Sequence, residues 1–186
     1  MNNPIRAAVQ RRIEAERFLR LGGPVRGVAL EIGCGRGVGA EIILDVFGAE
    51  GVDAFDLDPR MIVRARSRLA KRGDRVRLWT GDVTRIAAPD ETYDAVFDFG
   101  IIHHVAEWPR ALAEVARVLR SGGRFYAEEV LRPVIVHPVV RRLVSHPQAD
   151  RFDLAQFTET LLAVGLQPIA SQSVGGAFAW VVAKRS

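Results

Sequence analysis

The stretch "VALEIGCGRGVGAEII", residues 28–43, decides the fold. A short apolar run ends at Glu31, and glycines then occupy every second position from 33 to 39. A pattern typical of a helix comes next. A strand that turns into a helix through glycines brings its backbone close to a nucleotide-like ligand. The stretch therefore predicts a ligand site at the end of the first strand.

Hydrophobic periodicity predicts that strands and helices alternate along the rest of the chain. We expect strands at 28–32, 51–56, 75–80, 93–99, 123–131, 166–174 and 177–184, and helices at 5–20, 38–47, 59–71, 107–120 and 153–165. This pattern predicts an α/β fold with a doubly wound, Rossmann-like seven-stranded sheet that is mostly parallel. Gly175 and Gly176 join the last two strands without a helix, so the last strand should be antiparallel.

The length and composition predict one folded domain. The chain has 186 residues, of which 48% are hydrophobic, and its formal charge is +4. We expect a core over 25–186 and an N-terminal helix within 1–24 that could cover the site, with Ile5, Val9, Ile13 and Phe18 on its apolar face. No apolar run approaches the roughly 20 residues of a membrane span, and no signal-peptide core is present, which predicts a cytoplasmic protein.

Acidic residues stand at the carboxyl ends of all five expected parallel strands, where open α/β sheets bind their ligands. These are Glu31, Asp56, Asp82, Asp98, Glu128 and Glu129. A single cysteine, Cys34, excludes an internal disulfide and a cysteine-based zinc cluster, and no metal site is predicted. We expect Cys34 to be a small filler that contributes its backbone.

The glycine loop departs from the fingerprints of phosphate-binding loops. Counted from Gly33, the third glycine of a dinucleotide loop is replaced by Val38, and no Gly-Lys-Ser/Thr follows. A carboxylate two residues before the first glycine would repel a pyrophosphate and attract a cation. S-adenosylmethionine carries an ammonium and a sulfonium without phosphate, and Asp56 is placed to accept hydrogen bonds from its ribose.

These motifs together resemble the class I S-adenosylmethionine-dependent methyltransferases, in particular the small-molecule group of the ubiquinone/menaquinone type. "LEIGCGRG", "DAFDLDPRMIVRAR", "TGDV" and "YDAVFDFGIIHHVAEWPRALAEVARVLRSGGRFY" match the motifs of that family in order and spacing. The resemblance is close from Val28 to Leu131 and looser beyond. It implies S-adenosylmethionine as cofactor, S-adenosylhomocysteine as product and methyl transfer by in-line displacement.

The resemblance also implies a role for each motif residue. Glu31 would fix the methionyl ammonium, and the backbone of Gly33, Cys34, Gly35 and Gly37 would pass beside the methionyl part. Asp56 would bind the ribose, Leu57 and Met61 would pack on the adenine, and Asp82 and Val83 would contact the adenine edge. Asp98, Phe99 and Gly100 would line the methyl-donor end. Asp58 is more simply a helix cap.

The candidate catalytic residues are His103, His104 and Glu129. Methyl transfer from a sulfonium needs mainly proximity and alignment, and a base only when the acceptor carries a proton. Histidine has the pKa for that task. Because neighbours on a turn should point in different directions, we expect at most one histidine to face the acceptor. Glu128 and Glu129 should face opposite sides of their strand.

The absence of two known motifs narrows the range of possible acceptors. The fourth strand ends in "DFGI" rather than in the Asn/Asp-Pro-Pro-Tyr/Phe of base N-methyltransferases, and no cysteine stands where a cytosine C5 enzyme needs its nucleophile. Only residues 130–152 and the N-terminal helix could cover the acceptor. We therefore expect a small-molecule acceptor, with an open groove or a second subunit of a homo-oligomer as alternatives.

One segment supports a different partner. Between Arg60 and Arg77 there are eight basic residues and one acid, Asp74. A solvated helix face is the simpler interpretation, and the absence of interleaved aromatic residues disfavours nucleic acid. Two alternatives stay open: an RNA or protein methyltransferase that uses this segment, and a non-catalytic relative that binds the cofactor as a partner subunit.

Overall fold

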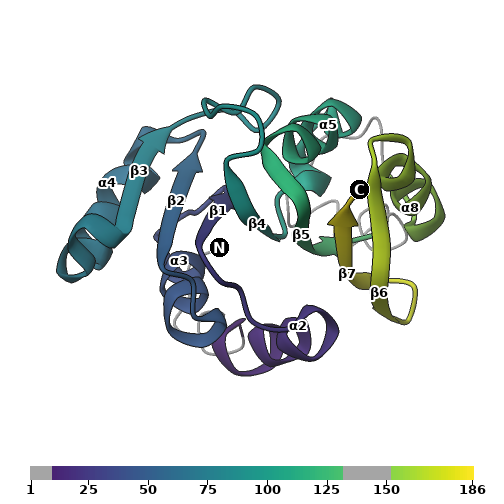
Figure 1. Ribbon diagram of the computed structural model, residues 1–186, viewed down its shortest axis with the longest axis horizontal. Helices are drawn as coiled ribbons and strands as arrows, with labels where there is room; N and C mark the ends of the chain where they lie inside the picture. Colours follow the sequence, from purple (N-terminus) through teal and green to yellow (C-terminus); the bar gives the residue numbers. More distant parts are fainter. Residues whose placement is uncertain (1–9, 132–151) are drawn as a thin grey trace, which may run out of the picture.

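A computed structural model describes residues 10–131 and 152–186 (Figure 1). Its strands are β1 (Val28–Ile32), β2 (Gly51–Asp56), β3 (Val76–Thr80), β4 (Tyr93–Phe99), β5 (Leu119–Val130), β6 (Leu166–Val174) and β7 (Phe178–Arg185). Its α-helices are α2 (Ala15–Gly22), α3 (Val38–Ile42), α4 (Pro59–Leu69), α5 (Trp108–Val118) and α8 (Leu154–Ala163). The shorter helical segments are η1 (Gln10–Glu14), η2 (Ile43–Phe47), η3 (Ala70–Arg75) and η4 (Ile102–His104).

The strands form one sheet in the order β3-β2-β1-β4-β5-β7-β6. The strands from β3 to β5 in this order pair in parallel, and β7 runs antiparallel to both β5 and β6. The predicted fold class and antiparallel last strand are therefore confirmed. Ile32 pairs with both Phe55 and Asp98, so β1, β2 and β4 end side by side. The chain order reverses between β1 and β4, the position where such sheets bind ligands.

Helices cover both faces of the sheet (Figure 1). One face packs on α2, α3, η2 and α4 through a buried cluster that includes Phe18, Phe47, Phe97 and Tyr126. The other face packs on α5 and α8 through a second cluster that includes Leu112 and Phe157. The tyrosine hydroxyl of Tyr126 ties the first cluster to the turn after α2, because it donates toward the Gly22 and Gly23 carbonyls, each 3.0 Å away.

Several boundaries differ from the predictions. The helix that begins at Pro59 ends at Leu69 and is followed by the η3 turn, within which Gly73 is non-helical. β5 begins at Leu119, four residues before its predicted start, directly after α5. In the N-terminal helix Ile13 is 52% exposed, whereas Phe18 is fully buried, so the buried face is rotated from the predicted one. Residues 1–9 and most of the predicted 130–152 cover lie outside the described residues.

Asp58 and Asp153 show how side chains fix helix starts. The Asp58 carboxylate accepts the Arg60 N–H at 2.9 Å, which confirms its predicted role as a cap. Asp153 and Gln156 form a reciprocal capping box at the start of α8. Within the two described segments no helix is long and apolar enough to cross a bilayer.

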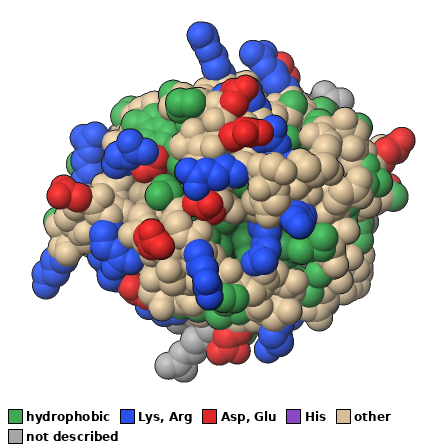
Figure 2. All heavy atoms as spheres, in the orientation of Figure 1, with side chains coloured by type: hydrophobic (Ala, Val, Ile, Leu, Met, Phe, Trp, Pro, Cys, Tyr) green, Lys and Arg blue, Asp and Glu red, His purple; other side chains and the backbone are tan. Residues whose placement is uncertain are grey.

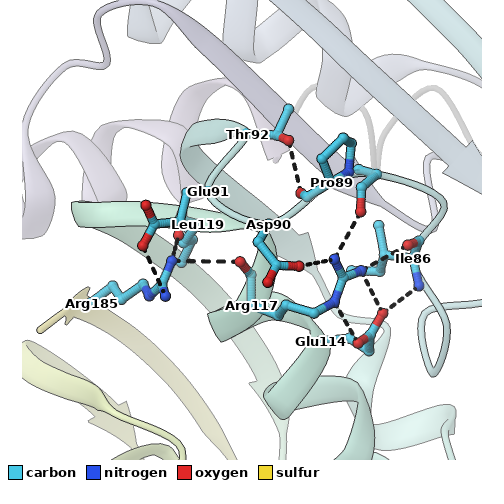
Figure 3. Close-up of polar contacts among 10 residues, drawn as sticks. Ile86, Pro89, Asp90, Glu91, Thr92, Glu114, Arg117, Leu119 and Arg185 are labelled. Carbon is cyan, nitrogen blue, oxygen red and sulfur yellow. Dashed lines mark hydrogen bonds and ion pairs between the residues drawn. The ribbon is translucent and has the colours of Figure 1, made fainter.

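Arg117 fastens the loop between β3 and β4 to the end of α5 (Figure 3). Its guanidinium donates to the Ala88 and Ile86 carbonyls at 2.8 and 2.9 Å. It also pairs with Glu114 at 2.8 Å and with Asp90 at 2.7 Å. Glu114 in turn accepts the Ile86 N–H at 2.8 Å. Arg117 therefore satisfies backbone groups of a loop that carries little regular structure of its own.

Replacement of Arg117 by alanine should destabilise the fold. The variant leaves two loop carbonyls and two carboxylates without their donor, which should lower the free energy of unfolding by about 2 kcal/mol. Urea unfolding at an unchanged m value measures the loss. Arg110→Ala on the same helix is the matched control, because its pair with Glu107 is exposed and should contribute less than about 0.5 kcal/mol. Equal losses in both variants would contradict this role.

Candidate functional site

The glycine loop after β1 has left-handed backbone at Gly33, Gly35 and Gly37. A Cβ at Gly33 would lie 2.2 Å from the Ile101 side chain, and one at Gly37 would lie 2.8 Å from Leu69. A Cβ at Gly35 would meet nothing within 4 Å, so the loop backbone is open there. The sequence requires glycine at all three positions, and the open position leaves room for a ligand against the backbone.

Glu31 is a buried carboxyl group beside this loop. Its side chain lies against Gly39, where a Cβ would stand 1.9 Å from Oε1, and Oε2 has no hydrogen-bond partner among the described residues. Burial raises the pKa of Glu31 well above its ordinary value, and the charge of Asp56 raises it further. The Ala40 N–H acts in the opposite direction. Such a carboxyl group would be stabilised as a carboxylate by a cation.

Asp56 connects the first two strand ends. Its oxygens accept the Gly35 N–H at 2.8 Å and the Asp58 N–H at 2.9 Å. The Cys34 N–H donates to the Phe55 carbonyl at 2.9 Å, so the loop and the end of β2 are joined twice. Each carboxylate oxygen keeps a second lone pair, which leaves Asp56 able to accept further hydrogen bonds.

The Cys34 thiol is buried, and burial, followed by the charges of Glu31 and Asp56, raises its pKa. The thiol therefore stays protonated at neutral pH and is a poor nucleophile. Its expected role as a small filler agrees with this environment. Within the described parts of the chain, no group of three or more histidine, cysteine, aspartate or glutamate side chains is arranged to hold a metal ion.

The predicted adenine residues lie near the ends of β2 and β3. Leu57 is 73% exposed directly after Asp56, and Met61 is half-buried on the first turn of α4. Asp82 is exposed and accepts the Thr84 N–H and hydroxyl at 2.8 and 2.9 Å, while Val83 is buried. An exposed apolar side chain next to a strand-end carboxylate provides an apolar contact beside a hydrogen-bond acceptor.

A second buried acid group lies at the ends of β4 and β5, on the α5 face of the sheet. Asp98 is fully buried and accepts the Ile101 N–H at 2.7 Å. Glu129 is 1% exposed, and it accepts the Ile102 N–H at 3.0 Å and the His103 N–H at 3.1 Å. These two carboxyl groups thus hold three successive N–H groups of the histidine turn. Asp98 therefore stabilises the backbone of the histidine turn. Its side chain lies on the opposite face of the sheet from Glu31.

His103 is buried and its Nδ1 lies 2.5 Å from Glu129 Oε2. Burial raises the pKa of Glu129 to about 7, and burial together with the Glu129 charge raises the pKa of Asp98. The His103 and His104 ring centroids are 4.2 Å apart. The expectation that the two rings diverge is wrong: the short η4 turn places them next to each other.

Phe99 and Gly100 complete the end of β4, and Phe99 lies on the face of Glu31. A Cβ on Gly39 would approach both the Glu31 carboxyl and the Phe99 ring, at 2.8 Å from the latter. Phe18 of α2 meets the Phe99 ring edge-on at 6.1 Å. Helix α2 therefore reaches the site. Gly39 and Phe18 were not predicted as site residues, since neither stands at a strand end.

Half of the eight cations of the predicted basic segment pair with carboxylates of the same chain. Arg60, Arg68, Arg72 and Arg77 pair with Asp58, Glu41, Asp45 and Asp53. Arg66 and Arg75 donate to backbone carbonyls. On the face that Figure 2 shows, basic side chains alternate with acidic ones and do not form an unbroken basic surface.

The sequence profile of a family described as a methyltransferase domain matches residues 29–123, which is more than half of the chain. The chain belongs to this methyltransferase family. Its Glu31 loop, Asp56 and Asp82 all lie within the matched residues. The subgroup expected from the resemblance, the ubiquinone/menaquinone type, is not singled out by this match.

Curated relatives of the chain are also named as methyltransferases. A probable S-adenosylmethionine-dependent methyltransferase of Mycobacterium tuberculosis is 37% identical over 94 residues, which are 50% of this chain and 32% of that protein. A probable phthiotriol/phenolphthiotriol dimycocerosates methyltransferase of Mycobacterium ulcerans is 31% identical over 146 residues, 78% of this chain and 48% of that protein. A fatty-acid O-methyltransferase of Mycolicibacterium smegmatis is 28% identical over 145 residues, 78% of this chain and 46% of that protein. The chain thus spans about half or less of these relatives.

Solved structures share the fold. A Pyrococcus horikoshii protein aligns with a TM-score of 0.77 at 20% identity, covering 100% of this chain and 92% of its own. Geranyl diphosphate C-methyltransferase from Streptomyces coelicolor, solved with S-adenosylhomocysteine, aligns with a TM-score of 0.77 at 16% identity, covering 93% and 80%. The structural similarity includes the C-terminal strands, which lie beyond residue 123 and therefore outside the family match.

Glu31→Gln should change how stability depends on pH. The pKa of Glu31 is raised in the folded state above its ordinary value, so the parent protein gains stability at low pH and loses it as pH rises through the raised pKa. The variant lacks this titration and should become relatively more stable with pH, by at most about 1.4 kcal/mol per pH unit. Urea unfolding of both proteins from about pH 5 to about pH 8 measures the difference. A difference that is constant over this range would contradict the burial of an uncompensated carboxyl group.

Proposed function

We propose that this chain is an S-adenosylmethionine-dependent methyltransferase that acts on a small-molecule acceptor and releases S-adenosylhomocysteine. The observation that carries the proposal is Glu31, a buried carboxyl group with an unpartnered oxygen beside an open glycine backbone. The names of the relatives support the cofactor, and those that name lipids or fatty acids support a small-molecule acceptor. A cytoplasmic location and a homo-oligomer are further expectations of the sequence.

The residues present fit this cofactor. Glu31 would pair with the methionyl ammonium, and the backbone at Gly35 would lie beside the methionyl chain. Asp56 would accept both ribose hydroxyls through its remaining lone pairs in charge-assisted hydrogen bonds. The exposed Leu57, with Met61, would pack on the adenine, and Asp82 and Val83 would contact its edge. A phosphate-bearing ligand fits less well, since Glu31 and Asp56 would both repel it.

The bound cofactor supplies an electrophilic methyl group on a sulfonium, so the protein must mainly position the acceptor. Phe99 and Gly100 would line the methyl end, and Asp98 would hold the following turn in place. For an acceptor that loses a proton, His103 would act as base. Its Nδ1 bond to Glu129 makes Nε2 the ring nitrogen that can take the proton, and His104 would flank it.

Asp56→Ala should weaken S-adenosylhomocysteine binding about 100-fold, since two charge-assisted hydrogen bonds are lost together with the anchor of the Gly35 backbone. Isothermal titration calorimetry measures the affinity. Asp58→Ala is the matched control two residues along the chain, because the Asp58 side chain caps α4 and pairs with the exposed Arg60, and this variant should bind as the parent does. An unchanged affinity in Asp56→Ala, or tighter binding of a dinucleotide than of S-adenosylhomocysteine, would contradict the proposal.

The histidine proposal predicts unequal effects. With a hydroxyl or ammonium acceptor, His103→Ala should lower kcat about 100-fold and His104→Ala less than about tenfold. Glu129→Gln should move the acidic limb of the kcat profile to lower pH, because a neutral amide no longer stabilises the imidazolium. Release of S-adenosylhomocysteine across a pH series reads out all three variants. Full turnover by His103→Ala would show that His103 has only a structural role in the turn.

RNA methylation is the weaker candidate. It would rest on the segment from Arg60 to Arg77, where four of the eight cations are paired with carboxylates and two more bind carbonyls. Turnover of a small molecule should persist in moderate salt, whereas RNA binding should weaken steeply as salt rises.

A further inference from the structure

The order of the strands fixes a direction across the site. If Asp82, Asp56 and Glu31 bind adenine, ribose and methionyl group, the cofactor extends over β3, β2 and β1 in turn. The next strands along the same line are β4, β5 and β7. An acceptor that approaches the methyl group from the far side must therefore lie over the ends of these three strands. This step rests on the proposed function.

Two polar side chains stand at this place on the face of Glu31. Glu128 of β5 is the register partner of both Phe99 in β4 and Trp180 in β7. Residues directly opposite in an antiparallel pair project from the same face, with Cβ atoms about 5 Å apart. Glu128 also follows Tyr126 by two residues, so it shares the face on which Tyr126 meets Phe18. Glu128 and Trp180 are therefore neighbours beneath α2.

Trp180 offers an unused hydrogen bond. The residue is 7% exposed, its Nε1 is buried, and this atom has no partner among the described residues. The guanidinium of Arg17 lies over its ring, 3.9 Å from the centroid. A buried donor without a partner is uncommon and costly, because it has lost water and gained nothing in return. Glu128, the register partner of Trp180, is also buried, at 5% exposure.

The surroundings of the pair are aromatic. Phe18 packs edge-on against Phe99 at 6.1 Å and against Tyr126 at 5.7 Å. Phe18 of α2 and Tyr126 of β5 are fully buried, so the polar pair borders the apolar core between α2 and the sheet. These surroundings favour an apolar molecule over a strongly hydrated one.

We infer that Glu128 and Trp180 form the polar anchor of the acceptor site, and that the acceptor is an uncharged, largely apolar molecule with a hydroxyl group at this anchor. A hydroxyl group both accepts and donates, so it can accept from Trp180 Nε1 and donate to Glu128. A carboxylate could accept from Trp180 Nε1 but would bring its oxygens against those of the Glu128 carboxyl group. An ammonium would face the Trp180 N–H donor and the Arg17 cation. The anchored hydroxyl group serves recognition and is distinct from the reacting atom near His103.

The test is calorimetry on the full chain saturated with S-adenosylhomocysteine. The probes are para-propylphenol, propylbenzene, para-propylbenzoate and para-propylbenzylamine, which share one apolar body and differ in the polar group. The phenol should bind most tightly. Trp180→Phe keeps an aromatic ring but removes the N–H, and it should weaken phenol binding by roughly three- to tenfold. Glu128→Gln should also weaken it by roughly three- to tenfold, because an amide NH2 group replaces one of the two oxygens that could accept the hydroxyl proton.

Trp79→Phe is the matched control, because it removes the other buried, unpartnered indole N–H without touching this part of the sheet. It should leave phenol affinity unchanged. S-adenosylhomocysteine affinity and the thermal midpoint verify that each variant is folded. If Glu128→Gln does not fold, the result for Trp180→Phe alone decides the test.

The inference is overturned if propylbenzene binds as tightly as the phenol, if the benzoate or the amine binds best, if no probe binds, or if Trp180→Phe and Trp79→Phe have equal effects. Failure of S-adenosylhomocysteine itself to bind would instead refute the proposed function, and the anchor with it.

Discussion

A carboxyl group buried at the end of β1 is the feature on which the rest of the site depends. Glu31 lies against Gly39, whose missing side chain leaves the space that the carboxyl group fills. Burial makes its charged form costly, and the described residues supply no cation. A protein keeps such a group at the cost of stability, and a cationic ligand is the simplest way to recover that cost.

The same constraint explains the neighbouring elements. Gly33, Gly35 and Gly37 turn the chain with left-handed backbone, side chains at Gly33 and Gly37 would clash with their neighbours, and Asp56 ties this turn to β2. Beyond β4, a second set of buried acids holds the histidine turn through backbone N–H groups. Glu31 and this second set of acids lie on opposite faces of the sheet, so Glu31 would be available to the proposed cofactor while the second set fixes the histidine turn.

The fold and the strand-end carboxylates could be predicted because both leave local signals. Alternating periodicity marks the strands, and glycines with an acid before them mark the loop. Gly39 and Phe18 could not be predicted as site residues, because their roles arise from contacts between α2, α3 and β4 that no spacing encodes. The rotated apolar face of the N-terminal helix has the same origin: packing on Phe99 and Tyr126 selects Phe18 over Ile13.

The histidine pair was predicted to diverge because residues on extended or regular turns alternate in direction. The η4 turn is tightened by Asp98 and Glu129, which accept consecutive N–H groups, and this brings both rings to one place. Likewise, the basic segment resembles a polyanion-binding surface only if the acidic residues on α3, η2 and β2 that pair with it are left out. Glu129 and the acids that pair with Arg68, Arg72 and Arg77 all lie more than twenty residues away in the sequence.

The most direct measurement is the number of protons released when S-adenosylhomocysteine binds. Calorimetry near neutral pH in buffers of different ionisation enthalpy gives this number. If the Glu31 carboxyl group is protonated in the empty site and becomes charged against the ligand ammonium, binding should release up to about one proton, and Glu31→Gln should abolish the release. Binding without proton release, or with the same release in Glu31→Gln, would contradict the role of Glu31.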